Sequence, residues 1–394
     1  MTNTERRIAI VGAGIGGLTL AIELRRQGLN VDVYEQTVEL REVGAAVALS
    51  ANATRFYIDR FGLEPQLKTV WNEINGLIFR DGRDGRVVGR HLSREQYRER
   101  FGAPYVGIHR ADLQAILSGA LGTDEVLHLS KRLIGIDESG RAAVLEFEDG
   151  TTAEADLVIG ADGVRSTVRR LMIGYDDALY TGCSGSRGIV AAENLSELPD
   201  PDTIQFWVGP GRHLLHYPIG TGEQNFLLVQ RGPAPWPYDE WVTQTEDGSH
   251  VEGFHDWHPA VVQMITAVPV QQRWALFHRP PLRSWSKGRV TLLGDAAHAM
   301  APHHGQGAGQ SIEDAIVLAD LLAMTNDWDG ARVEYERRRS DRTRKVQYAS
   351  ITVPDVLHLP DGPRSDRRNE RLGAVTAFDR HLTWIHAFRA DMDM

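Results

Sequence analysis

The sequence has little of what covalent, metal-based or membrane-bound functions require. Its one cysteine, Cys183, excludes an internal disulfide and a cysteine-rich zinc module. Only four residues are lysines, and none lies in an apolar setting that would lower its pKa, which disfavours Schiff-base chemistry. The sequence has no run of about 18 apolar residues, so we expect no membrane-spanning helix and a cytoplasmic location.

Positive charge is also in short supply. Lysine and arginine total 43 against 53 aspartates and glutamates, which gives a formal net charge of −10. Such a chain repels a phosphate backbone, so we expect no nucleic-acid partner. The 394 residues, 42% of them hydrophobic, instead predict an ordinary globular protein of two or three domains.

A glycine motif near the N-terminus predicts a dinucleotide site. An apolar strand leads into a turn with Gly12, Gly14 and Gly17 and then into a helix, and a second apolar strand ends at Glu35. The glycines of such a unit allow a tight turn, close approach of a pyrophosphate and close helix–strand packing. The acid binds a ribose 2′-hydroxyl, which favours FAD or NAD over NADP.

Two further strand ends carry acids. A strand at 156–160 leads to Asp162 and Gly163, and a strand at 289–293 leads to Asp295. In an open α/β sheet the ligand crevice lies at the carboxyl ends of the strands, so all three motifs can touch one extended ligand. Each motif alone is also typical of a plain turn.

A glycine-rich turn at 302–309 then feeds another helix. Exposed amides at a helix N-terminus attract negative charge, such as that of a reduced flavin ring. The alternative is a plain loop before a buried helix, with Glu313 and Asp314 simply occupying its first turns.

In this order the motifs resemble those of the single-component FAD-dependent aromatic hydroxylases, which have the p-hydroxybenzoate hydroxylase fold. Residues 40–44 and 109–113 also match, and residues 212–217 are similar to the salicylate and 6-hydroxynicotinate hydroxylase branch. The resemblance covers about residues 6–350. It implies an α/β fold, with a Rossmann-like FAD-binding domain, an inserted antiparallel-sheet substrate domain and a C-terminal helical tail.

The resemblance also implies cofactor contacts. Glu35 would hold the adenosine ribose, Arg110 the pyrophosphate and flavin region, and Asp295 the ribityl chain. NADH or NADPH would bind only transiently, near Asp162, Gly163 and Arg165, because FAD occupies the one dinucleotide fingerprint. The implied FAD-binding residues are Gly12, Gly14, Gly17, Glu35, Arg41, Arg110, Asp162, Gly163, Asp295, Pro302, Gly305, Gly307 and Ala308.

Between the second and third motifs the composition changes. Residues 203–231 alternate as antiparallel strands do, and residues 233–274 are rich in tryptophan. We therefore expect an FAD-binding domain at 1–175 and 281–350, a substrate domain at 176–280 to which part of 71–101 is a candidate addition, and a C-terminal extension at 351–394.

The C-terminal part predicts a helix, a loop and a second helix. Residues 328–348 form an Arg-rich helix whose charges, including Glu334 and Arg338 at the i,i+4 spacing, are expected to be solvated. A loop is expected from Pro354 to Arg371, followed by a docking helix around Trp384.

Period-two alternation places His213 and Tyr217 on one face of a strand in the inserted sheet. They are the candidate catalytic residues, because a histidine pKa near 6.5 suits deprotonation of a phenol. With Arg187 they are also the candidate substrate-binding residues. The alternative is that they are ordinary core or surface polar groups.

Three neighbouring histidines, His298, His303 and His304, lack the accompanying carboxylate or cysteine pattern of a metal site, so no metal is expected.

Two departures from the family pattern concern the substrate. Ala48 stands where the 6-hydroxynicotinate enzymes have a histidine that helps to hold substrate, which favours a benzoate over a pyridine. The run Ser184 to Arg187 has smaller residues than usual, which indicates a wider pocket.

The sequence thus predicts an FAD-dependent monooxygenase that hydroxylates a small electron-rich aromatic acid of the hydroxybenzoate or aminohydroxybenzoate type. By the family chemistry, NAD(P)H reduces the flavin, O2 adds at flavin C4a, and the hydroperoxide attacks an activated ring in a water-poor pocket. The alternatives are a flavin reductase or halogenase on the same fold, and a flavoprotein that senses redox state or binds partners without turnover.

Overall fold

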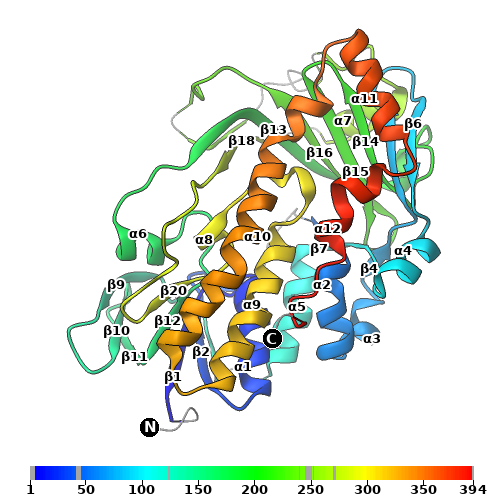
Figure 1. The fold of residues 1–394 in the computed structure, drawn as a ribbon. Coiled ribbons are helices and arrows are strands. Elements are labelled where there is room, and N and C mark those ends of the chain that lie inside the picture. The colour runs from blue at the N-terminus through cyan, green and yellow to red at the C-terminus, as the bar shows by residue number, and fades with distance from the viewer. Residues whose placement is uncertain are drawn as a thin grey trace.

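Two large β-sheets organise the chain in the computed structural model, which describes residues 5–40, 46–122, 125–238, 240–244, 251, 253–268 and 272–392. Figure 1 shows one sheet near the N-terminus and the other at the opposite end, with the long helix α10 running between them. Among the described helices, none combines the length and the apolar character needed to cross a bilayer.

The first sheet has six strands in the order β19-β20-β12-β1-β2-β8. All neighbouring pairs are parallel except β19 with β20. The central strands are apolar on both faces, as a parallel sheet covered on both sides requires. The strands are β1 Arg7–Val11, β2 Asn30–Tyr34, β8 Leu127–His128, β12 Leu157–Gly160, β19 Ser286–Lys287 and β20 Val290–Leu292.

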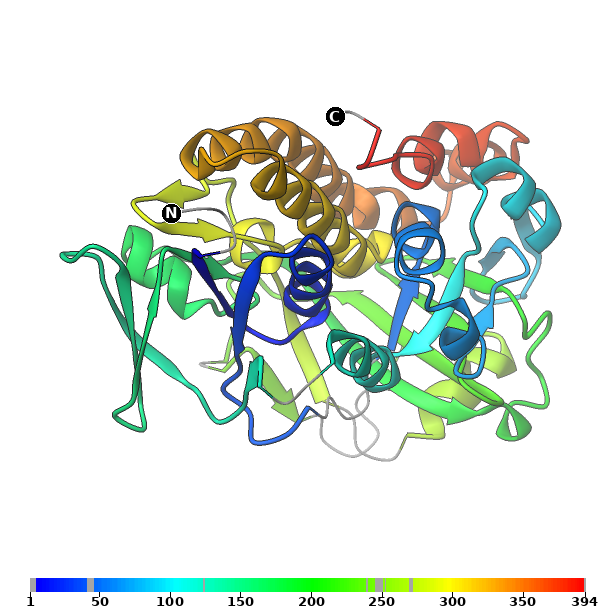
Figure 2. The same ribbon diagram turned by 90° about the horizontal axis from the view of Figure 1, so that it is seen from below.

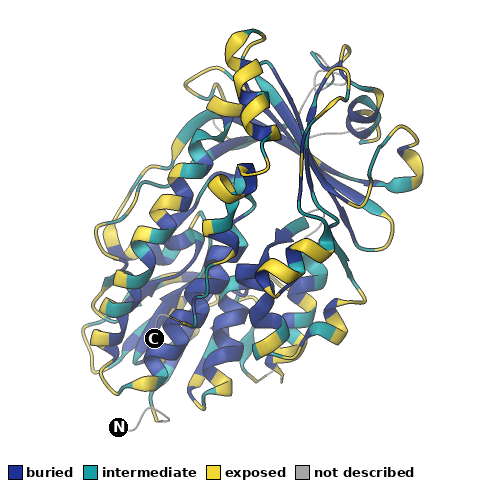
Figure 3. Ribbon diagram, turned by 45° about the vertical axis from the view of Figure 1, so that its right-hand side comes forward, coloured by how far each residue is buried: buried dark blue, intermediate teal, exposed yellow. Residues whose placement is uncertain are grey.

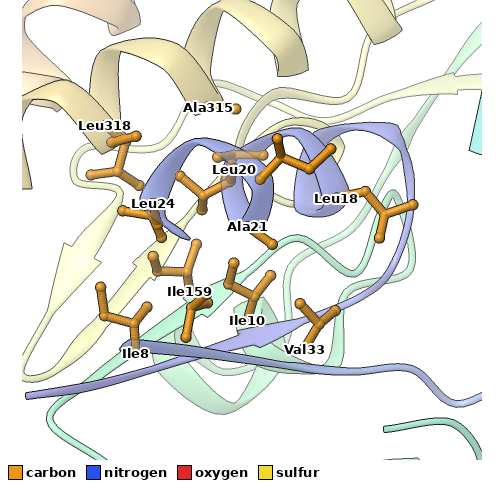
Figure 4. Close-up of a cluster of buried hydrophobic side chains, with 14 of the residues drawn as sticks. Ile8, Ile10, Leu18, Leu20, Ala21, Leu24, Val33, Ile159, Ala315 and Leu318 are labelled. Carbon is orange, nitrogen blue, oxygen red and sulfur yellow. The ribbon is translucent and has the colours of Figure 1, made fainter. Parts of the chain in front are cut away.

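Helices α1 (Ile15–Arg26), α5 (Arg110–Leu121) and α9 (Gly307–Met324) cover one face of this sheet. Figure 4 shows α1 between β1 and α9, with its leucines packed against isoleucines of the sheet. Burying each such side chain contributes about 1.5–3 kcal/mol, so this layer fixes the strand ends from which the glycine motifs project.

The second sheet has eight strands in the order β17-β18-β13-β16-β15-β14-β5-β6, all antiparallel except the β14–β5 pair. The antiparallel strands predicted in 203–231 are confirmed. The strands are β5 Leu77–Asp81, β6 Val87–His91, β13 Leu179–Ala191, β14 Ile204–Gly209, β15 Arg212–Ile219, β16 Glu223–Arg231, β17 Val242–Gln244 and β18 Gln272–His278.

Two three-stranded antiparallel sheets complete the β structure. One contains β3 Ala46–Leu49, β4 Trp71–Glu73 and β7 Val106–His109, and it packs on β15. The other contains β9 Leu133–Asp137, β10 Ala143–Phe147 and β11 Thr152–Ala155. The remaining helical segments are α2 Ala51–Arg55, η1 Phe56–Arg60, α3 Glu64–Leu67, α4 Arg94–Phe101, α6 Thr167–Ile173, η2 Ala192–Asn194, α7 Pro259–Thr266, α8 Asp295–His298, η3 Pro302–His304, α10 Trp328–Leu357, α11 Pro363–Gly373, η4 Asp379–Thr383 and α12 Trp384–His386.

One expectation for the C-terminal part is wrong. The loop expected from Pro354 to Arg371 is largely helical, because α10 continues through Pro354 and α11 follows. Arg368 of α11 donates to the Leu357 carbonyl (2.8 Å) and so stabilises the end of α10, which local sequence pattern could not reveal. Figure 2 shows the C-terminal helices returning beside α4 and α2.

Candidate active site

A cavity of about 900 Å³ lies between the carboxyl ends of the first sheet's strands and one face of the second sheet. Figure 3 shows that the strands of the second sheet are buried along most of their length. All three glycine motifs reach the cavity, through Gly14, Gly163 and Asp295, and so does the turn at 302–308. The convergence predicted from the strand ends is therefore present.

The first glycine turn fits a bound dinucleotide. A side chain on Gly12, whose φ is +108°, would lie 2.5 Å from the Ala161 carbonyl oxygen, and one on Gly17 would lie 2.0 Å from the Gly12 oxygen. Gly14, by contrast, has nothing within 4 Å of its Cβ position and lines the cavity. The turn thus leaves open space where a pyrophosphate would approach the N-terminus of α1.

Two of the acids predicted to bind FAD, Glu35 and Asp162, already accept hydrogen bonds from the chain itself. Glu35 follows β2, and its carboxylate accepts hydrogen bonds from the amides of Ala13 and Thr37 (both 2.9 Å), so it lies beside the glycine turn. Asp162 accepts hydrogen bonds from Ser166 and from the amides of Thr167 (2.7 Å) and Val168 (3.0 Å). Its carboxylate is therefore occupied by the start of α6, and Asp162 does not line the cavity, whereas its neighbour Gly163 does.

Asp295 faces the cavity from the N-terminus of α8, and its carboxylate accepts no hydrogen bond from any described residue. Burial raises the pKa of Asp295, and the charges of His298 and Arg110 oppose that rise. A buried acceptor of this kind suits the hydroxyls of a ribityl chain. Arg110 lines the same part of the cavity. Arg41, also predicted to bind FAD, lies outside the described residues.

The glycine turn before α9 rests on a buried charged network that the sequence did not predict. Gln306 donates to Ser50 (2.9 Å), and its amide oxygen accepts from Asn52 (3.1 Å), which also donates to Glu313 (2.7 Å). Pro302, Gly305, Gly307 and Ala308 line the cavity above this network.

Arginines of α10 neutralise the acids of α9. Arg339, fully buried, bonds Glu313 (2.5 Å) and Asp314 (2.6 Å), and Arg342 bonds Glu313 (2.7 Å). The expectation that the charges of α10 are solvated is therefore wrong for Arg339. The alternative in which Glu313 and Asp314 simply occupy the first turns of the helix misses that they hold α9 against α10.

The second sheet presents cross-strand rows to the cavity. One row runs through Phe79, Phe206, Leu215, Leu227 and Arg187, all of which line the cavity. Phe79 and Phe206 are stacked with centroids 5.2 Å apart. The Arg187 guanidinium lies over the Trp274 ring, 4.8 Å from its centroid. This wall is apolar with a cation at its edge.

Tyr217 and Asn225 form the next row. Both line the cavity, both are 6% exposed, and neither side chain has a hydrogen-bond partner among the described residues. Burial raises the pKa of Tyr217, Tyr105 adds to the rise, and Arg187 opposes it. Tyr217 therefore remains a protonated donor. Asn225 was not predicted, because asparagine in a strand carries no motif.

His213 shares the strand face of Tyr217 as predicted, but it lies two rows away, on the far side of the Leu215 row, and does not line the cavity. Its Nδ1 is 2.7 Å from Nε2 of His358, and its ring centroid is 5.6 Å from that of His303, which does line the cavity. Burial, with His358 and His303 nearby, lowers the pKa of His213 well below its ordinary range. The expectation of an ordinary histidine pKa is wrong.

The C-terminal extension forms part of the cavity wall, which the sequence did not predict. Leu357 and Leu372 contribute from α10 and α11, and Phe378, Arg380 and Trp384 contribute from the last helical segments. An aromatic cluster holds this segment to the body, with centroids of Tyr97 and Phe378 6.4 Å apart.

The charges around the cavity are unequal. Arg110, Arg165, Arg187 and Arg380 line it, and Asp295 is the only acid among the described lining residues. In a chain of net charge −10, this wall favours an anion. The described residues contain no group of His, Cys, Asp or Glu side chains arranged to hold a metal.

Comparisons with known proteins agree with this geometry. A family model described as an FAD binding domain matches residues 5–350. The chain is 37% identical to 3-amino-4-hydroxybenzoate 2-monooxygenase PtmB3 of Streptomyces platensis, over 99% of this chain and 98% of that protein. It is 34% identical to 6-hydroxynicotinate 3-monooxygenase of Bordetella bronchiseptica, over 87% and 90%. The fold superposes on Klebsiella pneumoniae HpxO complexed with FAD and uric acid, with a TM-score of 0.82, 28% identity and coverage of 94% and 93%.

Proposed function

The chain belongs to the FAD binding domain family of aromatic-acid monooxygenases, and we propose that its substrate is a small benzoate that carries hydroxyl or amino groups. The enzyme uses FAD and a reduced nicotinamide, NADH or NADPH. The observation that carries the substrate proposal is the cavity wall, in which an apolar aromatic row ends at Arg187 and adjoins the unpartnered donors Tyr217 and Asn225.

The residues present fit FAD. Bound FAD would supply the electron acceptor for the nicotinamide and the activation of O2. Gly14 would face its pyrophosphate, Asp295 its ribityl hydroxyls, and the amides of the turn at 305–308 its ring. Arg110 would balance its negative charge. Gly12 and Gly17 keep the turn tight enough for this approach.

The second sheet would bind and activate the ring. Burying a carboxylate without hydrogen-bond donors or a cation beside it costs several kcal/mol of binding free energy. In the cavity wall Arg187 would be the cation and Asn225 a neutral donor. Tyr217 would donate a hydrogen bond to the phenol oxygen and hold it in place. Neutral His213, which lies behind His303, would help to remove the phenol proton. Trp241 and Trp274, with the C-terminal segment, would keep water out.

Ala48 supports a benzoate over a pyridine. It lines the cavity from β3 and supplies no polar group there. The relative whose printed name gives an aminohydroxybenzoate is 37% identical, against 34% for the one whose name gives a hydroxynicotinate. We therefore propose an aminohydroxybenzoate or hydroxybenzoate.

The sheet memberships support the domain division proposed from the sequence. Strands β13 to β18 form one sheet, which β5 and β6 join, so a substrate domain at 176–280 would include part of 71–101. The FAD-binding domain would comprise 1–175 without that part and 281–350.

The test is a comparison of acids with their methyl esters. Purified enzyme with FAD is given 3-amino-4-hydroxybenzoate, 3-hydroxybenzoate, 6-hydroxynicotinate and the two benzoate methyl esters, and NAD(P)H oxidation, O2 uptake and product are measured. We expect a benzoate acid to stimulate NAD(P)H oxidation far more than its ester and to yield a hydroxylated product. Equal stimulation by acid and ester would contradict the carboxylate proposal. NAD(P)H oxidation without any hydroxylated product would favour a reductase.

A further inference from the structure

The cavity meets solvent in two places. Most of its described lining residues are buried or half-buried, and the exposed ones fall into two groups. Arg165 and Arg187 form the first group, with their guanidinium groups over the rings of Trp241 and Trp274. The second group comes from the end of α10 and from η4 and α12, and its members are Val356, Arg380, His381 and Trp384. We call the opening at these four residues the C-terminal mouth.

The two openings lie at opposite edges of the second sheet. Arg187 is on β13, whereas the C-terminal part packs on β6, where His91 donates from Nε2 to the Leu372 carbonyl (2.8 Å). The strand order places β13 four strand spacings from β5 and five from β6. At about 4.8 Å per spacing, the two edges are about 20 Å apart. A ligand at one opening therefore leaves the other open.

The C-terminal mouth leads directly to the proposed substrate wall. Phe378 belongs to the apolar cluster that contains Leu215 and Tyr217. Leu372 of α11 belongs to a second cluster, against which Phe206 packs. The inner walls of the mouth are therefore apolar, and they continue into the row of side chains that would bind the aromatic ring.

Arg380 supplies the positive charge of the C-terminal mouth. The acid next to it in sequence, Asp379, pairs with Arg100 and accepts a hydrogen bond from Thr383 (3.0 Å). Among the described residues no carboxylate forms an ion pair with Arg380. Burial and the charge of Arg380 lower the pKa of His381, so this histidine adds little charge at neutral pH.

We propose that the aromatic acid enters and leaves through the C-terminal mouth, and that Arg380 binds its carboxylate at the entrance. The inference rests on the proposed function, which supplies the acid. A chain of net charge −10 repels an anion over much of its surface, so a cation beside an opening directs where the acid approaches. The apolar walls then accept the ring, and Arg187 at the far end of the row takes over the carboxylate.

The first test measures the rate of binding to the oxidised holoenzyme, without NAD(P)H, by rapid mixing and the change in flavin absorbance. The probes are 3-amino-4-hydroxybenzoate and its methyl ester. We expect Arg380→Gln to lower the association rate constant of the acid by about 10-fold at low salt. The loss should shrink in about 0.5 M NaCl, where the Debye length is only about 4 Å. The association rate constant of the uncharged ester should not change.

Arg141→Gln is the matched control. Arg141 is exposed between β9 and β10 and does not line the cavity, and its replacement changes the net charge of the chain by the same amount. This variant should bind the acid at the wild-type rate. A wild-type rate in Arg380→Gln at low salt, or an equal loss in Arg141→Gln, would overturn the role of Arg380.

Thr352→Trp tests the route itself. Thr352 lines the cavity from α10 and is half-buried, so a large ring there narrows the C-terminal mouth. A barrier on the route slows entry and exit by the same factor, so we expect both rate constants to fall by about 10-fold while Kd stays nearly unchanged. Tyr348→Trp is the control, because Tyr348 is 71% exposed on α10 and does not line the cavity. Unchanged rate constants in Thr352→Trp would overturn the route.

These outcomes separate the route from the function. If the wild-type enzyme hydroxylates the acid and both Arg380→Gln and Thr352→Trp bind it at the wild-type rate, the function stands and the route is wrong. If the wild-type enzyme binds neither probe nor any hydroxybenzoate, the proposed function fails and the route fails with it.

Discussion

Gly107 of β7 lies directly beneath Tyr217 of β15. A Cβ on Gly107 would be 2.9 Å from Cδ2 of Tyr217 and 2.1 Å from the Pro218 carbonyl oxygen. Gly107 also pairs with Ala48 across the small sheet. The absence of a side chain at position 107 therefore allows the three-stranded sheet of β3, β4 and β7 to pack closely against β15 beside the Tyr217 ring.

Gly107→Ala should consequently disturb the substrate site. Because the backbone oxygen of Pro218 cannot move cheaply, we expect a loss of about 1–3 kcal/mol in the free energy of unfolding. We also expect less product per NAD(P)H oxidised. Denaturant unfolding and product analysis measure the two effects. Gly119→Ala, in α5 with nothing within 4 Å, is the control and should be neutral or stabilising.

Tyr217→Phe should keep FAD bound but reduce hydroxylation. A hydrogen bond to a charged group contributes about 1.5–3 kcal/mol, so kcat/KM should fall roughly 10- to 100-fold. More hydrogen peroxide should appear per NAD(P)H oxidised, and His213→Ala should behave similarly. Near-native coupled turnover in both variants would show that neither residue acts on the substrate.

Asp295→Ala should weaken retention of FAD, because the carboxylate that faces the cavity is lost. The purified wild-type protein should be yellow and release FAD on denaturation, and the flavin-to-protein ratio of the variant should fall. Asp295→Asn, which keeps a hydrogen-bond acceptor, should lose less FAD than Asp295→Ala. A colourless, folded wild-type protein that takes up no added FAD would contradict the cofactor assignment.

The buried acid Asp314 should make stability depend on acid pH. Burial alone would raise its pKa, but His298 and Arg339 lower it to about 2. Because the folded-state pKa is below the unfolded value of about 3.9, the contribution is present above pH ~4 and is lost as the pH falls toward ~2. In urea unfolding, the stability difference between wild type and Asp314→Asn should therefore shrink by roughly 2 kcal/mol over that range. A difference that stays constant with pH would refute this linkage.

Ala48→His should shift substrate preference. The new side chain would enter the cavity beside Gly107 and Tyr217, where it narrows the space and adds a polar group. We expect slower turnover of benzoates and improved binding of 6-hydroxynicotinate, measured as the ratio of kcat/KM for the two acids. Ala48→Val narrows the cavity without adding a polar group, so it should slow turnover of both benzoates and 6-hydroxynicotinate.

The sequence by itself determined the cofactor side of this protein. Strand, glycine turn, helix and acid are all local, and the geometry of a tight turn dictates which positions lack a side chain, so Gly12, Gly14 and Gly17 could be identified by spacing. The alternation that puts His213 and Tyr217 on one strand face was likewise a local property and is confirmed, since His213 lies beside Phe206, in the row of Leu215.

Only the tertiary structure decided what each of those side chains meets. The strand register places His213 in the row next to Leu215, outside the residues that line the cavity, and places Asn225 beside Tyr217. Helix packing buried Arg339 against Glu313, and it placed His358 on His213 across 145 residues of sequence. These contacts depend on how distant elements pack, and packing follows from burial of apolar surface over the whole chain, which no local pattern encodes.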